Sequence, residues 1–177
     1  MILREATPQD APGLATIYAH HVLHGFGTFE EEPPSAEEMA RRLAEIVARG
    51  LPWLVAEEGS ELLGYAYASP FRLRTAYRFT VEDSVYVSAQ SQGRGVGRVL
   101  LTELIARCEA LGVRQMLAVI GDSANAASIA LHRAMGFEMS GTTRAVGYKA
   151  GRWVDIVSMQ RALGPGASAP PSGMGIL

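Results

Sequence analysis

The amino-acid sequence predicts an α/β domain with a mixed, mostly antiparallel central sheet flanked by helices. Its 177 residues, 48% apolar and 19% charged, have the composition of one packed globular domain. The predicted elements follow the order strand, two helices, three strands, helix, strand, helix and two strands. Because hairpins give antiparallel neighbours and strand–helix–strand units give parallel ones, this order predicts a sheet of both kinds.

The N-terminal half predicts a strand, two helices and a hairpin. Apolar and charged residues alternate at the start, and Pro8 after Thr7 is typical of a helix start. Ser35 and Glu38 can cap each other's backbone donors at the start of the second helix. A Gly59-Ser60 turn joins two segments rich in aromatic and branched residues. We expect strands at 2–6, 53–58 and 61–69, and helices at 7–24 and 35–50.

The C-terminal half predicts four strands and two helices. Apolar residues at steps of three and four mark one buried helix face, so we expect Cys108, which lies on it, to be a core residue. Asn125 is a good helix cap and Gly136 a helix stop. The buried face comprises Val96, Val99, Leu100, Leu104, Cys108 and Leu111. We expect strands at 79–87, 115–120, 137–144 and 152–159, and helices at 96–111 and 125–136.

The composition also limits the kinds of partner and the cellular location that we expect for the protein. The net charge of -2 gives no general attraction to nucleic acid or to an anionic membrane, and no run approaches the roughly 18 apolar residues of a membrane span. The apolar start of the chain is short and is interrupted by charged residues within positions 1–6, unlike a signal peptide, so we expect a cytoplasmic protein. Glycine, proline, serine and alanine dominate residues 164–177. They predict a disordered tail after a single domain of residues 1–163.

A glycine-rich loop joins a predicted strand to a predicted helix. Its residues are Gln92-Gly93-Arg94-Gly95-Val96-Gly97-Arg98. Free N–H groups at a helix start and two nearby arginines suit a pyrophosphate, although the glycines could instead only make a tight turn. The P-loop pattern fails because Arg98-Val99 follows the last glycine, and the dinucleotide fingerprint fails on glycine spacing.

Together with two other segments, this loop resembles the motifs of a known family. Gln92-x-x-Gly95-x-Gly97 after a strand ending Val85-Tyr86-Val87 resembles the acyl-CoA motif of the GCN5-related N-acetyltransferases, the GNAT superfamily. Asn125 and residues 131–137 resemble its later motif. Residues 80–88 and Gly147-Tyr148-Lys149-x-Gly151-x-Trp153-x-Asp155 further resemble the phosphinothricin and methionine sulfoximine acetyltransferases. The similarity in element order runs from residue 2 to about 163.

The resemblance implies an enzyme that moves acetyl from acetyl-CoA, its co-substrate, to the amino group of a small amino-acid-like molecule. It also implies a homodimer and a role in detoxification. Near Val85 to Val87, the predicted strand is expected to splay from its neighbour, which frees backbone groups to bind the thioester and pantetheine. The residues expected to bind acetyl-CoA are Val85, Tyr86, Val87, Gln92, Gly93, Arg94, Gly95, Val96, Gly97, Arg98, Asn125 and Ser128.

Attack on a thioester requires a neutral amine, so an ammonium substrate must lose a proton to a base. The resemblance assigns this role to Glu82, which without it would be an exposed strand glutamate in an ion pair. The departing thiolate needs a proton, and His132 stands where the superfamily often has a tyrosine. A histidine can donate near neutral pH, although a lone helical histidine is more often structural.

Other polar residues have two interpretations each. Asn125 either caps its helix or also reaches the pantetheine arm, and Ser128 either contacts the cofactor or lies plainly on the surface. His20, His21 and His24 lie on the first helix. A metal site there lacks both an H-E-x-x-H pattern and an evident third ligand, so we expect solvated or loop-packing side chains.

The substrate side is expected between two strands, where residues 70–78 concentrate three arginines. Arginine binds carboxylate or phosphinate bidentately, although a solvated basic loop has the same spacing. The resemblance selects Arg72, Arg74 and Tyr77. Phe29 and Glu30, in the loop between the first two helices, either form a further wall of this pocket or pack on the surface. Two alternatives stay open: acetylation of protein N-termini or general amines such as polyamines, and a non-catalytic CoA-binding module.

Overall fold

The computed structural model describes residues 1–176, which form a seven-stranded sheet in the order β1-β2-β3-β4-β5-β7-β6. A short 3-10 turn at Pro8–Asp10 precedes the first helix. The helices are α1 (Ala11–His24), α2 (Ala36–Ala48), α3 (Val96–Ala110) and α4 (Ala126–Ala134). The strands are β1 (Ile2–Glu5), β2 (Trp53–Glu58), β3 (Glu61–Pro70), β4 (Thr80–Val87), β5 (Gln115–Gly121), β6 (Glu138–Lys149) and β7 (Arg152–Ala162).

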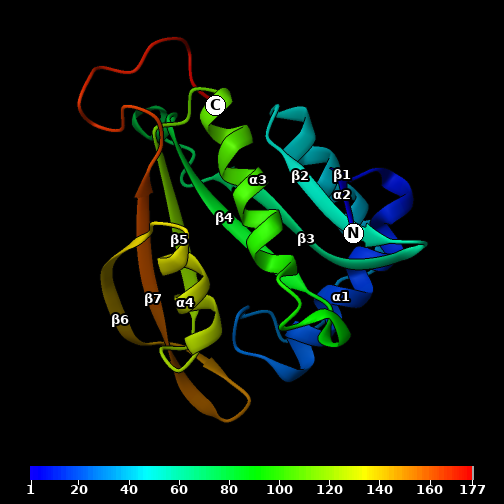
Figure 1. The fold of residues 1–177 in the computed structure, drawn as a ribbon. Helices are drawn as coiled ribbons and strands as arrows, with labels where there is room; N and C mark the ends of the chain where they lie inside the picture. Colours follow the sequence, from blue (N-terminus) through cyan, green and yellow to red (C-terminus); the bar gives the residue numbers. More distant parts are fainter. Residues whose placement is uncertain (177) are drawn as a thin grey trace.

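Strand directions confirm the mixed, mostly antiparallel sheet. Within the described residues β4 and β5 pair in parallel, and each of the other neighbouring pairs is antiparallel. Figure 1 shows α3 and α4 on one face of the sheet and α1 and α2 on the other. The fold is therefore a three-layer arrangement with a core on each side of the sheet.

The two cores follow from the alternation of side chains along the strands. Leu100 and Leu104 of α3 pack with Met116 of β5 in one cluster. Leu14 of α1 and Tyr65 of β3 belong to the other. Cys108 is fully buried, and burial raises the pKa of its thiol to about 12. This confirms that Cys108 is a core residue.

The last two strands are longer than predicted. The sequence predicts strands at 137–144 and 152–159, whereas β6 runs to Lys149 and β7 to Ala162. Ala150 and Gly151 join them with φ angles of 49° and 79°, the left-handed conformation of a two-residue hairpin turn. The sequence lacks the Asn-Gly signal of such turns, and Gly147 interrupts the strand pattern, so the true turn was missed.

The C-terminal segment 164–176 contains turns but no helix or strand. Arg114 donates hydrogen bonds to the carbonyl oxygens of Gly166 at 3.0 Å and Ala169 at 2.7 Å. The disordered tail at 164–177 stays a prediction, and its last residue, Leu177, lies outside the described residues. None of the helices within 1–176 combines the length and apolar character that a membrane crossing requires.

Candidate active site

The sheet opens between its two parallel strands. β4 pairs with β5 from Thr80 to Asp83, where Asp83 lies opposite Ala118. Beyond this point the ladder stops, although β4 continues to Val87 and β5 to Gly121. Main-chain groups on the facing edges are thereby released from pairing with one another, as the resemblance implies.

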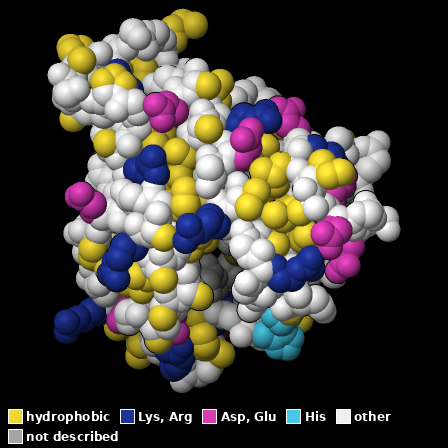
Figure 2. Space-filling view, viewed as in Figure 1, with side chains coloured by type: hydrophobic (Ala, Val, Ile, Leu, Met, Phe, Trp, Pro, Cys, Tyr) yellow, Lys and Arg dark blue, Asp and Glu magenta, His cyan; other side chains and the backbone are white. Residues whose placement is uncertain are grey.

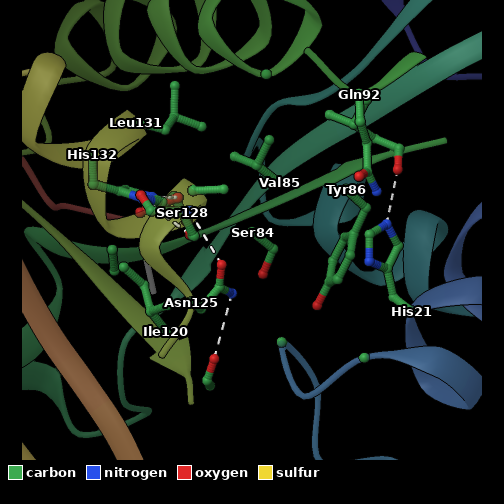
Figure 3. A pocket seen from close by; sticks show the side chains of 18 of the residues that line it. His21, Ser84, Val85, Tyr86, Gln92, Ile120, Asn125, Ser128, Leu131 and His132 are labelled. Carbon is green, nitrogen blue, oxygen red and sulfur yellow. Dashed lines mark hydrogen bonds and ion pairs between the residues drawn. The ribbon is translucent and has the colours of Figure 1, made fainter. Parts of the chain in front are cut away.

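A cavity of about 730 Å³ occupies this opening, within the size range of small-molecule sites. Figure 2 shows it as a hollow below the centre of the molecule. In Figure 3, His21, Tyr86 and Gln92 lie on one side of it and Asn125, Ser128 and His132 on the other. The predicted acetyl-CoA residues that line it are Val85, Tyr86, Val87, Gln92, Gly93, Gly95, Val96, Gly97, Arg98, Asn125 and Ser128.

Arg94 is the predicted acetyl-CoA residue that does not line the cavity. Its guanidinium donates to a carboxylate oxygen of Glu58, the last residue of β2, at 2.8 Å. The two residues lie 36 positions apart, so the strand–loop–helix pattern carries no sign of this ion pair. Arg98 remains the arginine of the loop that faces the cavity.

The start of α3 is built to accept an anion. Gly95 caps the helix with a φ of 80°, a conformation that side chains other than glycine adopt at a cost. No side chain caps the first turn, so its N–H groups and the positive end of the helix dipole are available to a ligand. A Cβ on Gly97 would lie 3.2 Å from Leu131, so glycine there lets α3 lie close to α4.

Glu82 and Asp83 are neighbours on β4 and therefore face opposite sides of the sheet. Glu82 shares the face of Tyr86, whose ring packs edge-on against Tyr18 of α1 with ring centroids 4.9 Å apart. Burial, and then the charge of Asp83, raises the pKa of Glu82 to about 7. The cavity wall includes Asp83 but not Glu82. A carboxyl group with this pKa is suited to accept a proton near neutral pH.

His132 faces the cavity from α4 and is buried, with 4% of its surface exposed. Its Nδ1 lies 2.8 Å from the carbonyl oxygen of Ser128, and its Nε2 lies 3.0 Å from a carboxylate oxygen of Asp83. Burial acts to lower the pKa of His132, but the hydrogen bond and charge of Asp83 outweigh it, so the pKa is raised.

Asn125 caps α4, because its Oδ1 accepts a hydrogen bond from the backbone N–H of Ser128 at 3.2 Å. The capping role is confirmed. Both side chains also lie on the cavity wall, where contact with the pantetheine arm stays a prediction.

The predicted substrate residues divide between two loops, and none of them lines the cavity. In the β3–β4 loop, the guanidinium carbon of Arg72 lies 5.1 Å from the ring centre of Phe71 and 6.0 Å from that of Tyr77. Arg74 is exposed in the same loop.

In the α1–α2 loop, Phe29 covers Gly147 of β6, where a side chain would collide with its ring. Glu30 accepts hydrogen bonds from Tyr18 and Arg42 at 2.9 and 2.8 Å, which neutralises much of its charge. Glu30 therefore has a structural role in holding this loop to both helices.

His21 is a cavity residue that the sequence interpretation missed. Its Nε2 donates to the carbonyl oxygen of Val87 at 2.9 Å, and burial lowers its pKa, so the ring is the neutral tautomer with a proton on Nε2. Leu14, Ile17 and Tyr18 are buried on the same helix, and the spacing places His21 on their face. That spacing could have distinguished it from His20 and His24, whose rings pair 5.0 Å apart.

No group of three or more His, Cys, Asp or Glu side chains within 1–176 could hold a metal ion.

A mixed sheet that splits between its parallel strands, beside an uncapped helix start, is the architecture of an acyl-CoA-binding acetyltransferase. The acetyltransferase (GNAT) domain model matches residues 3–158. The chain therefore belongs to the GNAT acetyltransferase family, and it is an N-acetyltransferase that uses acetyl-CoA.

The similarity extends to individual relatives. Phosphinothricin N-acetyltransferase of Alcaligenes faecalis is 52% identical, over 96% of this chain and 86% of that protein. The L-methionine sulfoximine/L-methionine sulfone acetyltransferase of Pseudomonas paraeruginosa is 44% identical, over 95% and 98%. The crystal structure of a phosphinothricin acetyltransferase from Sinorhizobium meliloti with acetyl-CoA superimposes with a TM-score of 0.94 at 51% identity, covering 98% of this chain and 94% of that one.

Proposed function

We propose that this enzyme acetylates the α-amino group of a small amino-acid-like substrate of the phosphinothricin, methionine sulfoximine or methionine sulfone type. Relatives with these activities in their names are 52% and 44% identical along nearly the whole chain. The observation that carries the chemistry is Glu82, a partly buried carboxyl group with a pKa of about 7 on the strand that borders the split.

In the proposed reaction Glu82 takes a proton from the substrate ammonium, directly or through one water, and the neutral amine attacks the thioester carbonyl. Backbone N–H groups freed by the split would stabilise the oxyanion that forms. His132 lies across the sheet from Glu82 and would give the departing thiolate its proton. Arg72 and Arg74 would hold the carboxylate or phosphinate so that the amine faces the thioester.

The proposal extends to the setting of the enzyme. β6 is an edge strand, and Val146, Tyr148 and Trp153 of the β6–β7 hairpin expose much of their apolar surface, which supports a homodimer. Light scattering after size-exclusion chromatography tests that state. A cytoplasmic protein that detoxifies toxic amino-acid analogues, without binding nucleic acid or membranes, fits the use of acetyl-CoA and a small substrate.

Free-thiol release from acetyl-CoA, measured across several amine classes, tests the proposed substrate. We expect the highest kcat/KM with phosphinothricin, methionine sulfoximine or methionine sulfone, and much lower values with polyamines and short peptides. Faster reaction with peptides or polyamines would replace the proposal by a protein N-terminal or general amine acetyltransferase. N-acetylated substrate, which has no free amine, is the control for background hydrolysis.

A further inference from the structure

Glu82, the proposed base, does not line the cavity in which the thioester is expected, whereas Ser84, two residues further along β4, does. In the proposed reaction an amine at the split must lose its proton to Glu82. A group that touches both the cavity and the surroundings of Glu82 is therefore needed to carry this proton.

Ser84 lies between Glu82 and the split. Pairing of β4 with β5 ends at Asp83, so Ser84 is the first residue of β4 beyond that ladder. The β3–β4 register is regular here, so residues two apart point to the same face, and Ser84 lies about 7 Å along the strand from Glu82. In Figure 3 the hydroxyl oxygen of Ser84 is directed into the open space between the two sides of the cavity.

Tyr67 of β3 connects Ser84 to Glu82. Tyr67 lies directly opposite Ser84 in the antiparallel register and diagonally from Glu82, a separation that long side chains span. Burial raises the pKa of Tyr67, a hydrogen bond from Ser84 acts against this, and the charge of Glu82 raises the pKa further. A serine hydroxyl has one donor and two acceptor sites, so Ser84 can donate to Tyr67 and still accept a hydrogen bond from an amine in the cavity.

We propose that Ser84 and Tyr67 form a hydroxyl relay that carries the proton of the substrate ammonium from the split to Glu82. The relay rests on the proposed function, in which Glu82 is the base. An N–H bond of the ammonium breaks as an O–H bond forms at Ser84, and Ser84 passes its own proton to Tyr67. Tyr67 passes its proton to the carboxylate of Glu82, directly or through one water.

The protons and charges of the relay balance. The ammonium becomes a neutral amine, the carboxylate of Glu82 becomes a neutral carboxyl group, and each hydroxyl gains one proton as it gives one away. Neither hydroxyl has to ionise, so the raised pKa of Tyr67 does not block the transfer.

Two other hydroxyl groups on this face of the sheet fit the role less well. Tyr86 lines the cavity, but it lies four residues from Glu82, and its ring packs edge-on against Tyr18 of α1. Ser69 lies directly opposite Glu82 but does not line the cavity, so it cannot meet an amine there. Of the two hydroxyl side chains of β4 on the cavity wall, Ser84 is therefore the nearer to Glu82.

Free-thiol release with the best acceptor amine, whichever class it belongs to, tests the relay. Ser84→Ala and Tyr67→Phe each break the chain, and Tyr67→Phe keeps the ring that stacks on Trp53 with centroids 4.1 Å apart. We expect kcat to fall roughly 10- to 150-fold in each variant, the effect of losing one hydrogen bond to a charged group. Acetyl-CoA affinity, measured by calorimetry, should stay the same.

Matched controls remove hydroxyl groups on the same face that do not line the cavity. Ser69→Ala removes the hydroxyl opposite Glu82. Tyr65→Phe removes a buried hydroxyl that has no hydrogen-bond partner among the described residues. Both variants should keep the kcat of the parent enzyme.

Combination with Glu82→Gln distinguishes a relay from a structural role. Once the base is lost, the hydroxyl groups have no acceptor to serve, so Ser84→Ala or Tyr67→Phe should lower kcat of Glu82→Gln by no more than about threefold. Losses that multiply, or a parent-like kcat in either single hydroxyl variant, overturn the relay and leave Glu82 as the base. A parent-like kcat in Glu82→Gln overturns the proposed base and the relay together, whereas a preference for polyamines or peptides overturns only the proposed substrate.

Discussion

The ammonium group of Lys149 lies 2.8 Å from the carbonyl oxygen of Thr28, a residue 121 positions earlier in the chain. It also donates to the carbonyl oxygen of Gly25 at 2.9 Å. Lys149, the only lysine of the sequence, is 5% exposed, and burial lowers its pKa although Glu31 and Glu30 act against this. The end of β6 thereby fixes the α1–α2 loop, whose first residues line the cavity.

Replacing Lys149 with methionine should loosen that loop. Two carbonyl groups would lose a charged donor, and each buried group left unpaired costs about 1–3 kcal/mol. We expect a lower free energy of unfolding in urea and weaker acetyl-CoA binding by calorimetry. Arg144→Met, an exposed change on the same strand, should alter stability by no more than about 0.5 kcal/mol. Equal stability of the two variants would show that Lys149 does not hold the loop.

Gly97→Val should weaken acetyl-CoA binding. A Cβ at this position would lie 3.2 Å from Leu131 and 3.6 Å from Val87, so the valine methyl groups would crowd the wall shared by α3 and α4. Overpacking of this kind costs about 1–3 kcal/mol, which corresponds to a roughly 5- to 150-fold loss of affinity if it falls on the bound state. Calorimetry measures it, and Gly141→Val, which meets no atom within 4 Å, is the control. Unchanged affinity in folded Gly97→Val would remove this position from the binding site.

Local patterns account for what the sequence predicted well. Apolar spacing located α3, and the three glycines located the helix start that borders the cavity, because both depend on residues close together in the chain. The misses depend on distant contacts. The ion pair that turns Arg94 toward Glu58 and the contact of Asp83 with His132 join residues 36 and 49 positions apart. His21 differs, because its position on the buried face of α1 is visible in the spacing, whereas its hydrogen bond to Val87 joins residues 66 positions apart.

Glu82→Gln should lower kcat by roughly 10²–10⁴-fold while acetyl-CoA affinity stays nearly intact, because only proton removal from the ammonium is lost. In the parent enzyme kcat/KM should rise with pH through about 7, where the carboxyl group ionises. The deficit of the variant should shrink at high pH, where free amine is abundant. Turnover equal to that of the parent near neutrality would return Glu82 to a structural role.

The same carboxyl group makes a prediction about stability. The pKa of Glu82 is about 7 in the folded protein against an ordinary 4.5, so the folded state holds this proton more tightly than the unfolded state. Its contribution to the free energy of unfolding is therefore present below pH 4.5 and decreases as the pH rises through 7, by on the order of 3 kcal/mol. Calorimetric melting at pH 5 and pH 8 should show a smaller loss in Glu82→Gln than in the parent. Parallel losses would mean that the environment of Glu82 does not raise its pKa in the folded protein.

Replacing Arg72 with lysine tests the carboxylate anchor. Lysine keeps the positive charge but lacks the planar fork that binds a carboxylate through two hydrogen bonds, and it loses the packing on Phe71 and Tyr77. Since hydrogen bonds to charged groups contribute about 1.5–3 kcal/mol, kcat/KM for the amino acid should fall by roughly 10- to 100-fold while acetyl-CoA affinity is retained. The methyl ester of the substrate should react poorly with the parent enzyme, so the variant should discriminate less between acid and ester.

Arg49→Lys, an exposed change at the end of α2, is the matched control for the Arg72 variant. If the parent enzyme used the ester as well as the acid, Arg72 would not be a carboxylate anchor, and acetylation of general amines or peptides would become the better explanation.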